Sequence, residues 1–227
     1  MRSLFVIVAM IWLGAASVKA AALAVVMAVD VSDSVTAVSY VLQRDGIARA
    51  FEDPRLLKAV AAAPRGIEAL VLEWSDPDKI AVTVGWTQIT GRQSAAAFAA
   101  AVRATRRSSR GLTATGPALA AAAAQFNDLP QPAARRVIDI SGDGMANLGP
   151  PPEIVRDTIV KAGITINGLA ILTDEPWLED YYRDHVIGGR GAFVVAARDF
   201  HSFFDAMLKK LSVEVAGAGA STLAQMQ

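Results

Sequence analysis

The sequence predicts a doubly wound α/β domain, in which helices cover both faces of a mostly parallel central sheet with one antiparallel edge strand. Three observations favour this class. Apolar, β-branched runs of strand length alternate with segments of helical periodicity along most of the chain. Two of the strand-like runs end in acidic, hydroxyl-rich loops. Apolar residues make up 53% of the chain and aromatic residues only 7%, which suits small-residue helices packed closely on a sheet.

The first twenty residues have the features of an export signal. Arg2 provides a positive start, residues 4–15 are almost wholly apolar, and Val18-Lys19-Ala20 places small residues at a cleavage site. Lys19 interrupts the apolar run before it reaches the roughly 20 residues that a bilayer span requires. We therefore predict a signal peptide over 1–20 and no integral membrane span after its removal.

One α/β domain is expected to follow the signal, over residues 21–215, with a flexible small-residue tail over 216–227. Lys plus Arg and Asp plus Glu are both 22, so no net field draws the protein to nucleic acid. The absence of cysteine removes disulfides and thiolate metal sites, and it is compatible with an oxidising compartment. We predict a periplasmic or secreted protein with no nucleic-acid partner.

The first half of the domain is expected to place one antiparallel strand at the sheet edge. Residues 22–29 read as a strand buried on both faces, and 35–62 as a helix broken near Asp53-Pro54, because the residue before proline is pushed out of the α region. Two further strand-like runs, 66–74 and 80–89, are separated by only five turn-forming residues. This spacing predicts an antiparallel hairpin.

The second half alternates helix and strand, which implies right-handed crossovers and a parallel sheet. An arginine-rich loop is expected to run to Gly111, and Thr115 is expected to cap the helix that follows, with Pro117 in its first turn. The predicted helices are 94–105, 115–126, 150–162, 177–185 and 200–213, and the predicted strands are 136–140, 164–172 and 192–196.

Oxygen-bearing side chains follow the first and fourth predicted strands. In open α/β sheets, ligands lie beyond the carboxyl ends of the strands, at the point where the strand order reverses. Asp30, Ser32 and Ser34 stand at alternate positions and can turn three oxygens toward one point, and Asp143 adds a carboxylate if the two strands are neighbours. Such a set suits a hard divalent cation, because Mg²⁺ prefers oxygen ligands and takes only one or two carboxylates from a protein.

A third loop carries Thr113, and with it the sequence resembles the von Willebrand factor type A family. The resemblance rests, in chain order, on Asp30-Val31-Ser32-Asp33-Ser34, the Gly-x-Thr at Thr113, and Asp143-Gly144-Met145-Ala146-Asn147, and it covers nearly the whole mature chain. It is similar to the short exported bacterial single-domain members of unassigned function. The resemblance implies a Rossmann-like fold with a metal-ion-dependent adhesion site.

Carried over to this chain, the resemblance implies that Ser32, Ser34 and Thr113 bind the metal directly, while Asp30 and Asp143 act largely through water. The cation is expected to be Mg²⁺, with Mn²⁺ or Ca²⁺ as alternatives. Its open position would accept an Asp or Glu from a partner protein that the sequence does not identify.

Two positions depart from the family pattern. Leu112 stands where a second glycine is common, and Gly142 stands where a hydroxyl residue usually precedes the aspartate. Thr115 therefore competes with Thr113 for the role of the loop ligand. We prefer Thr113, because Thr115 is better placed as a helix cap.

Several other residues admit two interpretations. Asp139, within the fourth strand, is either an outer-shell partner of the site or an edge-facing or capped aspartate. The arginines that precede the threonine loop are interpreted as a solvated helix end rather than as a rim that steers acidic partners. Core packing is the preferred role for the aromatic residues of the 177–185 helix. The arginines are Arg103, Arg106, Arg107 and Arg110, and the aromatic residues are Trp177, Tyr181 and Tyr182.

The function favoured is a non-enzymatic adhesion or assembly module whose cation is completed by a partner's carboxylate. The alternative is a Mg²⁺-dependent phosphatase of haloacid-dehalogenase type, to which Asp30, Thr113 and Asp143 are also similar in order. That mechanism needs a nucleophile with a second carboxylate two positions later, and here that position is Ser32. No lysine stands between Thr113 and Asp143 to neutralise a phosphate, so hydrolysis is disfavoured.

Overall fold

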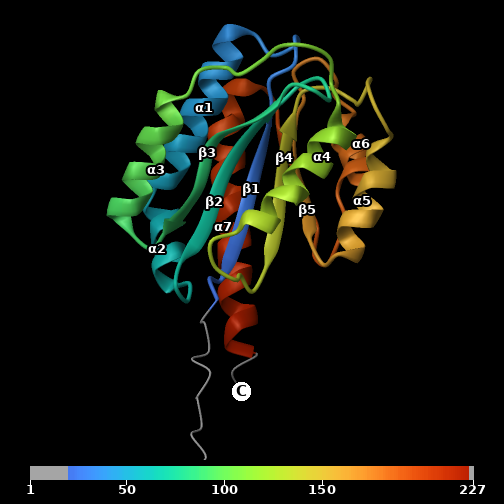
Figure 1. Ribbon diagram of the computed structural model, residues 1–227. Coiled ribbons are helices and arrows are strands. Elements are labelled where there is room, and N and C mark those ends of the chain that lie inside the picture. Colours follow the sequence, from blue (N-terminus) through green and yellow to red (C-terminus); the bar gives the residue numbers. More distant parts are fainter. Residues whose placement is uncertain (1–19, 225–227) are drawn as a thin grey trace, which may run out of the picture.

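A six-stranded sheet forms the centre of the domain in the computed structural model, which describes residues 20–224 (Figure 1). The predicted signal peptide, apart from Ala20, lies outside the described residues. The strand order is β3-β2-β1-β4-β5-β6. The strands are β1 (Leu23–Asp30), β2 (Ile67–Trp74), β3 (Ile80–Ile89), β4 (Arg136–Gly142), β5 (Thr165–Ile171) and β6 (Val194–Ala197).

The pairing confirms the predicted mostly parallel sheet with one antiparallel edge strand. β3 pairs antiparallel with β2 and lies at the edge, as the short link between them predicts. All other pairs are parallel. β1 lies next to β4, with Val29 opposite Ser141, so the strand order reverses between these two strands. Their carboxyl ends, and the loops that follow them, therefore meet at one edge of the sheet.

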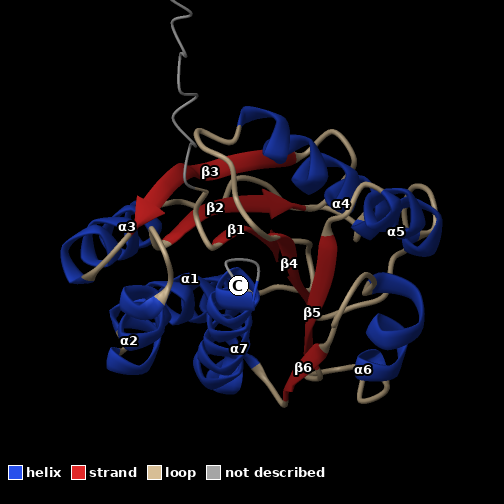
Figure 2. Cartoon of the chain, turned by 90° about the horizontal axis from the view of Figure 1, so that it is seen from below, coloured by secondary structure: helices blue, strands red, loops and turns tan. Residues whose placement is uncertain are grey.

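The helices form two layers. α1 (Ala37–Glu52), α2 (Pro54–Ala62), α3 (Arg92–Ala104) and α7 (Phe203–Ala224) cover one face, and α4 (Thr115–Ala124), α5 (Pro152–Lys161) and α6 (Leu178–Tyr181) cover the other. Figure 2 shows α1, α2 and α7 below the sheet and α4 and α5 above it. Short helical turns follow α4, at Gln125–Asp128, and precede α7, at Phe200–Ser202, and a π-helical turn, Tyr182–Val186, continues α6.

β1 has a hydrophobic core on each side, as its uninterrupted apolar sequence predicts. Val25, Met27 and Val29 pack toward α1 and α7, whereas Val26 and Ala28 belong to the core under α4. Every residue of the strand is buried. The last residue, Asp30, follows the same alternation, so it belongs to the α4 side.

The break predicted at Asp53-Pro54 is also confirmed. Asp53 ends α1 with an extended backbone, and its carboxylate accepts a hydrogen bond from the Arg55 backbone N–H at 2.8 Å, which caps α2. One aspartate thus serves as the end of one helix and the N-cap of the next.

Two expectations about helix ends are wrong. Ala114 is the N-cap of α4 and Thr115 is its first residue, so Thr115 does not cap the helix. The loop is held instead by backbone bonding, since the Ala114 N–H donates to the Ser75 carbonyl at 3.0 Å. The closing helix α7 runs to Ala224 rather than Val213, so residues 216–224 are helical where a flexible tail is expected, because their alanines favour a helix. Within the described residues, no helix is long and apolar enough to cross a bilayer.

Asp139 points into the core between the sheet and α7, where it forms an ion pair with Lys210. Lys210 also contacts the Glu214 carboxylate at 3.2 Å, and that carboxylate accepts a hydrogen bond from Asn167 at 2.7 Å. Burial raises the pKa of Asp139 to about 7, although the positive charge of Lys210 opposes the shift. Asp139 is therefore a core ion-pair partner, which corrects both roles that we considered for it.

We expect Lys210→Met to lower the free energy of unfolding by about 3–5 kcal/mol, because it leaves two carboxylates buried without their cation. Chemical denaturation measures the effect, and Lys209→Met, at the exposed neighbouring position, is the matched control. Adding Asp139→Asn and Glu214→Gln should recover part of the loss. Equal stability of the Lys210 and Lys209 variants would contradict this interpretation.

Candidate metal centre

A chain of hydrogen bonds brings together four of the five predicted site residues at the carboxyl edge of β1 and β4. The Asp30 Oδ1 atom accepts a bond from the Ser32 backbone N–H at 2.7 Å, which turns the chain sharply after β1. The Ser32 and Ser34 hydroxyls are 3.2 Å apart, and the Ser34 hydroxyl donates to Asp143 Oδ1 at 2.7 Å. Oxygens from two loops thus converge on one point.

The loop that carries Thr113 is fastened to both of the other loops. The Thr113 N–H donates to the Asn147 side-chain oxygen at 2.8 Å, and the Asn147 N–H donates to the Thr113 carbonyl at 3.0 Å. On the other side, the Asp33 N–H donates to the Gly111 carbonyl at 2.8 Å. These two bonds with Asn147 place Thr113 beside the Asp143 loop. Our reason for preferring Thr113 over Thr115 as the loop ligand is therefore this contact, because Thr115 does not cap the helix.

Arg107 binds the backbone of the Asp-x-Ser-x-Ser loop. Its guanidinium donates to the carbonyls of Val31 and Ser32 at 2.6 Å each, and to the carbonyl of Val35 at 2.7 Å. A planar fork of several donors can bind carbonyls that diverge in this way, whereas a lysine ammonium cannot match it. Our interpretation of the arginine run as a solvated helix end is therefore wrong for Arg107, because this side chain fixes the loop backbone.

The two carboxylates of the centre are buried, and their hydrogen bonds compensate for only part of the desolvation cost. Asp30 is fully buried and Asp143 is 4% exposed, and the Oδ2 atom of each has no hydrogen-bond partner among the described residues. Burial raises the pKa of Asp30 to about 7, and burial also raises the pKa of Asp143. A cation offsets such desolvation, because it favours the charged form of a carboxyl group. This donor set therefore fits a hard divalent cation.

Hydroxyl groups are essential to that fit. Within residues 20–224, no three His, Cys, Asp or Glu side chains gather where they could hold a metal ion. A cation at this edge would therefore need the Ser32, Ser34 and Thr113 hydroxyls in addition to the two carboxylates. The Ser34 side chain is exposed, so the centre opens toward solvent on this side.

Three residues of the centre escape prediction from the sequence. Arg107 and Asn147 bind backbone atoms, and such contacts produce no motif of characteristic spacing in the sequence. Tyr182 reaches the centre from the turn after α6, and its hydroxyl lies 2.6 Å from the point that a Cβ atom on Gly142 would occupy. The absence of a hydroxyl residue at position 142 was the one sequence signal that could have indicated it.

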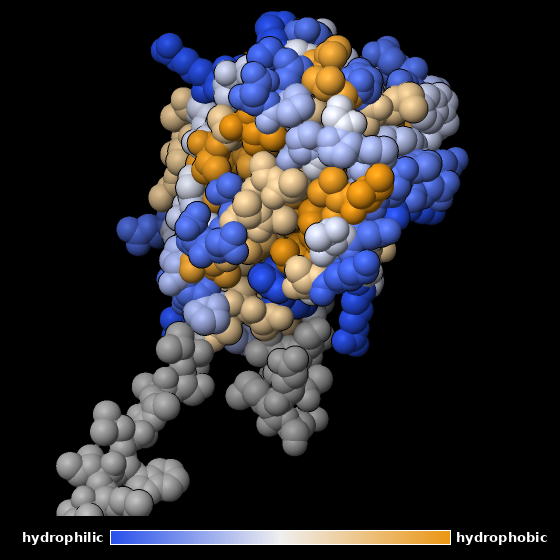
Figure 3. Space-filling model, turned by 45° about the vertical axis from the view of Figure 1, so that its right-hand side comes forward, coloured by the Kyte–Doolittle hydropathy of each residue, from blue (hydrophilic) through white to orange (hydrophobic). Residues whose placement is uncertain are grey.

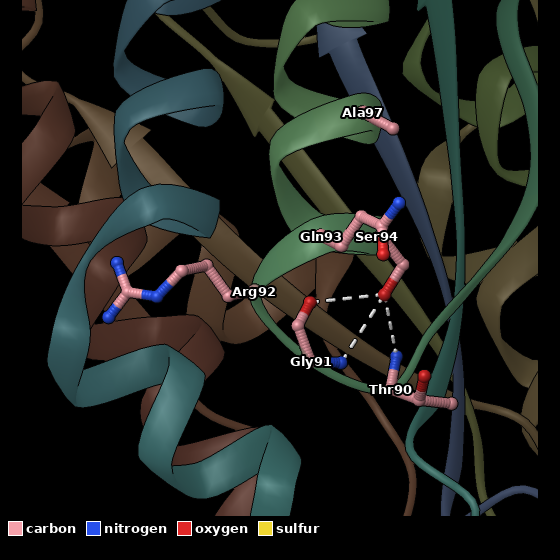
Figure 4. A pocket seen from close by; sticks show the side chains of 6 residues that line it. All are labelled: Thr90, Gly91, Arg92, Gln93, Ser94 and Ala97. Atoms are coloured by element: carbon pink, nitrogen blue, oxygen red, sulfur yellow. Dashed lines mark hydrogen bonds between the residues drawn. The ribbon is translucent and has the colours of Figure 1, made fainter.

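A surface hollow at the start of α3 offers no comparable chemistry. It lies at the opposite end of the sheet, because β3 runs antiparallel. Figure 4 shows the Ser94 hydroxyl bonded to the backbone of Thr90 and Gly91, so these polar groups already satisfy one another, while Arg92 points away. None of the buried side-chain atoms that lack a hydrogen-bond partner in residues 20–224 belongs to this hollow.

Comparison with known proteins agrees with the fold. A family model described as "Protein of unknown function (DUF1194)" matches residues 20–219. A search of the curated proteins found no match. Among solved structures, the chain is similar to a von Willebrand factor type A protein from Catenulispora acidiphila, with 18% identity and a TM-score of 0.59 over 85% of this chain and 42% of that one.

Two further structures are similar. The pilus adhesin SpaC from Lactobacillus rhamnosus GG has 13% identity and a TM-score of 0.64, over 88% of this chain and 31% of that one. Proximal thread matrix protein 1 from the mussel byssus, in a structure described as having a zinc-occupied MIDAS motif, has 16% identity and a TM-score of 0.60, over 85% and 46%. The chain spans less than half of each of these three proteins. The likeness confirms the predicted von Willebrand factor type A fold.

We expect Arg107→Lys to lower the free energy of unfolding by about 2 kcal/mol, because lysine keeps the charge but cannot bond all three loop carbonyls. Thermal and chemical unfolding measure this difference. Arg106→Lys, at the exposed preceding position, should have no effect. If both variants unfold like the wild type, Arg107 does not hold the loop.

Proposed function

This chain belongs to the DUF1194 family, and we propose that it is an exported protein-binding module that holds one divalent cation between Asp30, Ser32, Ser34, Thr113 and Asp143. Mg²⁺ is the cation that the oxygen ligands favour, and Mn²⁺ is a close substitute. When bound, the cation supplies a positive charge with an open coordination position for an Asp or Glu of a partner protein. The observation that carries this proposal is that Asp30 and Asp143 each have a buried carboxylate oxygen with no hydrogen-bond partner in residues 20–224.

In the proposed division of roles, the hydroxyls of Ser32, Ser34 and Thr113 coordinate the cation directly. Ser34 is exposed, whereas Ser32 and Thr113 are buried. Asp30 is also buried, and one of its oxygens is already engaged by the Ser32 N–H, so it suits an outer role through water. The three hydroxyls are neutral, so the bound cation keeps a net charge that attracts a partner's carboxylate.

Binding is favoured over hydrolysis. A phosphatase of haloacid-dehalogenase type would need Asp30 as an accessible nucleophile, but Asp30 is fully buried. Ser32 stands where the general acid is needed, and its backbone holds Asp30 instead of a substrate. The structural relatives include an adhesin and a matrix protein, which supports an adhesion or assembly role.

Apolar side chains stand around the centre and suit contact with a protein surface. Leu112 adjoins Thr113 and is 51% exposed, and Met145 follows the Asp143 loop and is 43% exposed. Trp177, at the start of α6, is 47% exposed, so the core packing that we expected for it is wrong. Figure 3 shows apolar spots among hydrophilic residues at the upper end of the molecule, the end that carries these loops. A partner would therefore meet aromatic and methionine side chains, which are enriched at protein interfaces, beside the cation.

Calorimetric titration with Mg²⁺ or Mn²⁺ tests the metal centre. We expect one site per wild-type chain and at least about 10-fold weaker binding in Ser34→Ala, because the variant removes a proposed ligand and the hydrogen bond that this hydroxyl donates to Asp143. Ser39→Ala, at the partly exposed position five residues later in α1, is the matched control and should bind as the wild type does. Identical heats for all three proteins, or no binding by the wild type, would contradict the proposed cation site.

A second experiment tests the partner. Immobilised protein should retain a protein from the exported fraction in Mg²⁺ and release it on addition of a chelator. Leu112→Ala and Trp177→Ala should weaken that retention without changing metal affinity, because these side chains contact the partner and not the cation. Retention that is unaffected by the chelator would contradict a carboxylate-to-cation contact.

A further inference from the structure

Gly142 lies at the centre of a crowded corner of the site. A Cβ atom on this residue would lie 2.6 Å from the Tyr182 hydroxyl and 2.8 Å from Asp30 Oδ2. Both distances are shorter than real Cβ contacts, so a side chain at position 142 cannot coexist with the present position of Tyr182. The hydroxyl residue that usually precedes this aspartate in the family pattern is absent here, and a hydroxyl from elsewhere in the chain occupies that corner.

Tyr182 packs against two glycines, which leave room for it because they have no side chains. Gly168 on β5 pairs with Ile140 on β4, so it lies beside the strand that leads to Gly142. A Cβ atom on Gly168 would lie 2.7 Å from the Tyr182 ring. The ring thus lies against β5 at Gly168 and extends its hydroxyl to β4 at Gly142. Both glycines are needed for close approach, since neither has a positive φ.

The backbone around Tyr182 also departs from a regular helix. Tyr182 begins the π-helical turn Tyr182–Val186, which continues α6, and the Ile187 N–H donates to the Tyr182 carbonyl at 2.9 Å. Single π-turns inside helices are rare and occur frequently at functional sites. Here the turn lies directly beside the centre.

The Tyr182 hydroxyl is fully buried but has no hydrogen-bond partner among the described residues, and Asp30 Oδ2 beside it is in the same state. A buried hydroxyl without a partner is costly, and a phenylalanine would fill the same space without that cost. Burial keeps the pKa of Tyr182 well above its usual range, so the group remains a neutral donor. A donor and an acceptor therefore face one corner of the centre, and packing alone does not explain the donor.

We propose that Tyr182 is a positioning residue of the cation centre, whose hydroxyl takes the place of the hydroxyl residue missing at position 142 and orients the Asp30 side of the cation's hydration shell. This inference rests on the proposed function, because it assigns a role to Tyr182 only when the cation is bound. It also explains why position 142 is glycine: the hydroxyl arrives from the turn after α6 instead of from β4.

The test is Tyr182→Phe, which removes one oxygen and keeps the ring. We expect Mn²⁺ affinity, measured by calorimetry, to fall about 10-fold, as outer-shell substitutions do. The melting temperature of the metal-free protein should stay unchanged or rise, since no hydrogen bond is lost. Tyr40→Phe is the matched control: the Tyr40 hydroxyl donates to Glu73 at 2.9 Å, so this variant should melt at a lower temperature and bind Mn²⁺ as the wild type does.

A spectroscopic measurement on the wild type adds a second, independent readout. The chain has three tyrosines, and addition of Mg²⁺ to the wild type should perturb the tyrosine ultraviolet absorbance, a signal that Tyr40→Phe retains and Tyr182→Phe loses. Unchanged Mn²⁺ affinity in Tyr182→Phe, or a wild type that binds Mg²⁺ without any tyrosine signal, would overturn this inference and leave the proposed function standing. A wild type that binds neither cation would overturn both.

Discussion

Two carboxylates, Asp30 and Asp143, are buried together at the place where the strand order of the sheet reverses, and the rest of the centre depends on that constraint. Each has one oxygen bonded to a serine of the first loop and one oxygen without a partner among the described residues. Burying carboxylates in this way raises their pKa values and disfavours folding, unless positive charge or donors compensate. The surrounding structure supplies compensation only in part: Arg107 binds the backbone of the loop and not the carboxylates themselves. The remaining deficit is the property that makes this edge of the sheet suited to a cation.

The scaffold holds the carboxylates and the proposed ligands through packing and backbone contacts. β1 and β4 are central strands with helices on both faces. Arg107 fixes the loop after β1, and Asn147 fastens the threonine loop to the loop after β4. Tyr182 completes the enclosure from the turn after α6. Oxygen ligands that are held by backbone contacts in advance of binding lose less entropy when they engage a ligand, which is the physical value of such clamps.

The sequence was sufficient for the fold class and for most of its elements, because most strands and helices carry a strong local pattern. β1 is an uninterrupted apolar run, the five-residue link between β2 and β3 permits only an antiparallel return, and Asp53-Pro54 separates α1 from α2. The convergence of Asp30, Ser32, Ser34 and Asp143 was predictable once β1 and β4 were taken as neighbours.

The contacts of Arg107 and Asn147 were not predictable, because a side chain that bonds distant backbone carbonyls or amides leaves no periodicity or spacing in the sequence. The ion pair of Asp139 with Lys210 joins residues 71 positions apart, and only the packing of α7 on the sheet brings them together. The end of α7 was misplaced because alanine and glycine stretches are compatible with both a loop and a helix.

We propose that the oxygens of Ser32, Ser34 and Thr113, with the two carboxylates behind them, hold one divalent cation. The decisive measurement is a crystal structure of the protein grown in Mn²⁺, with anomalous diffraction recorded at the manganese edge. We expect a single strong anomalous peak within bonding distance of the Ser32, Ser34 and Thr113 hydroxyls, with the Tyr182 hydroxyl hydrogen-bonded on the Asp30 side. An ordered crystal structure with no peak at this edge of the sheet, or with the peak at another part of the molecule, would contradict it.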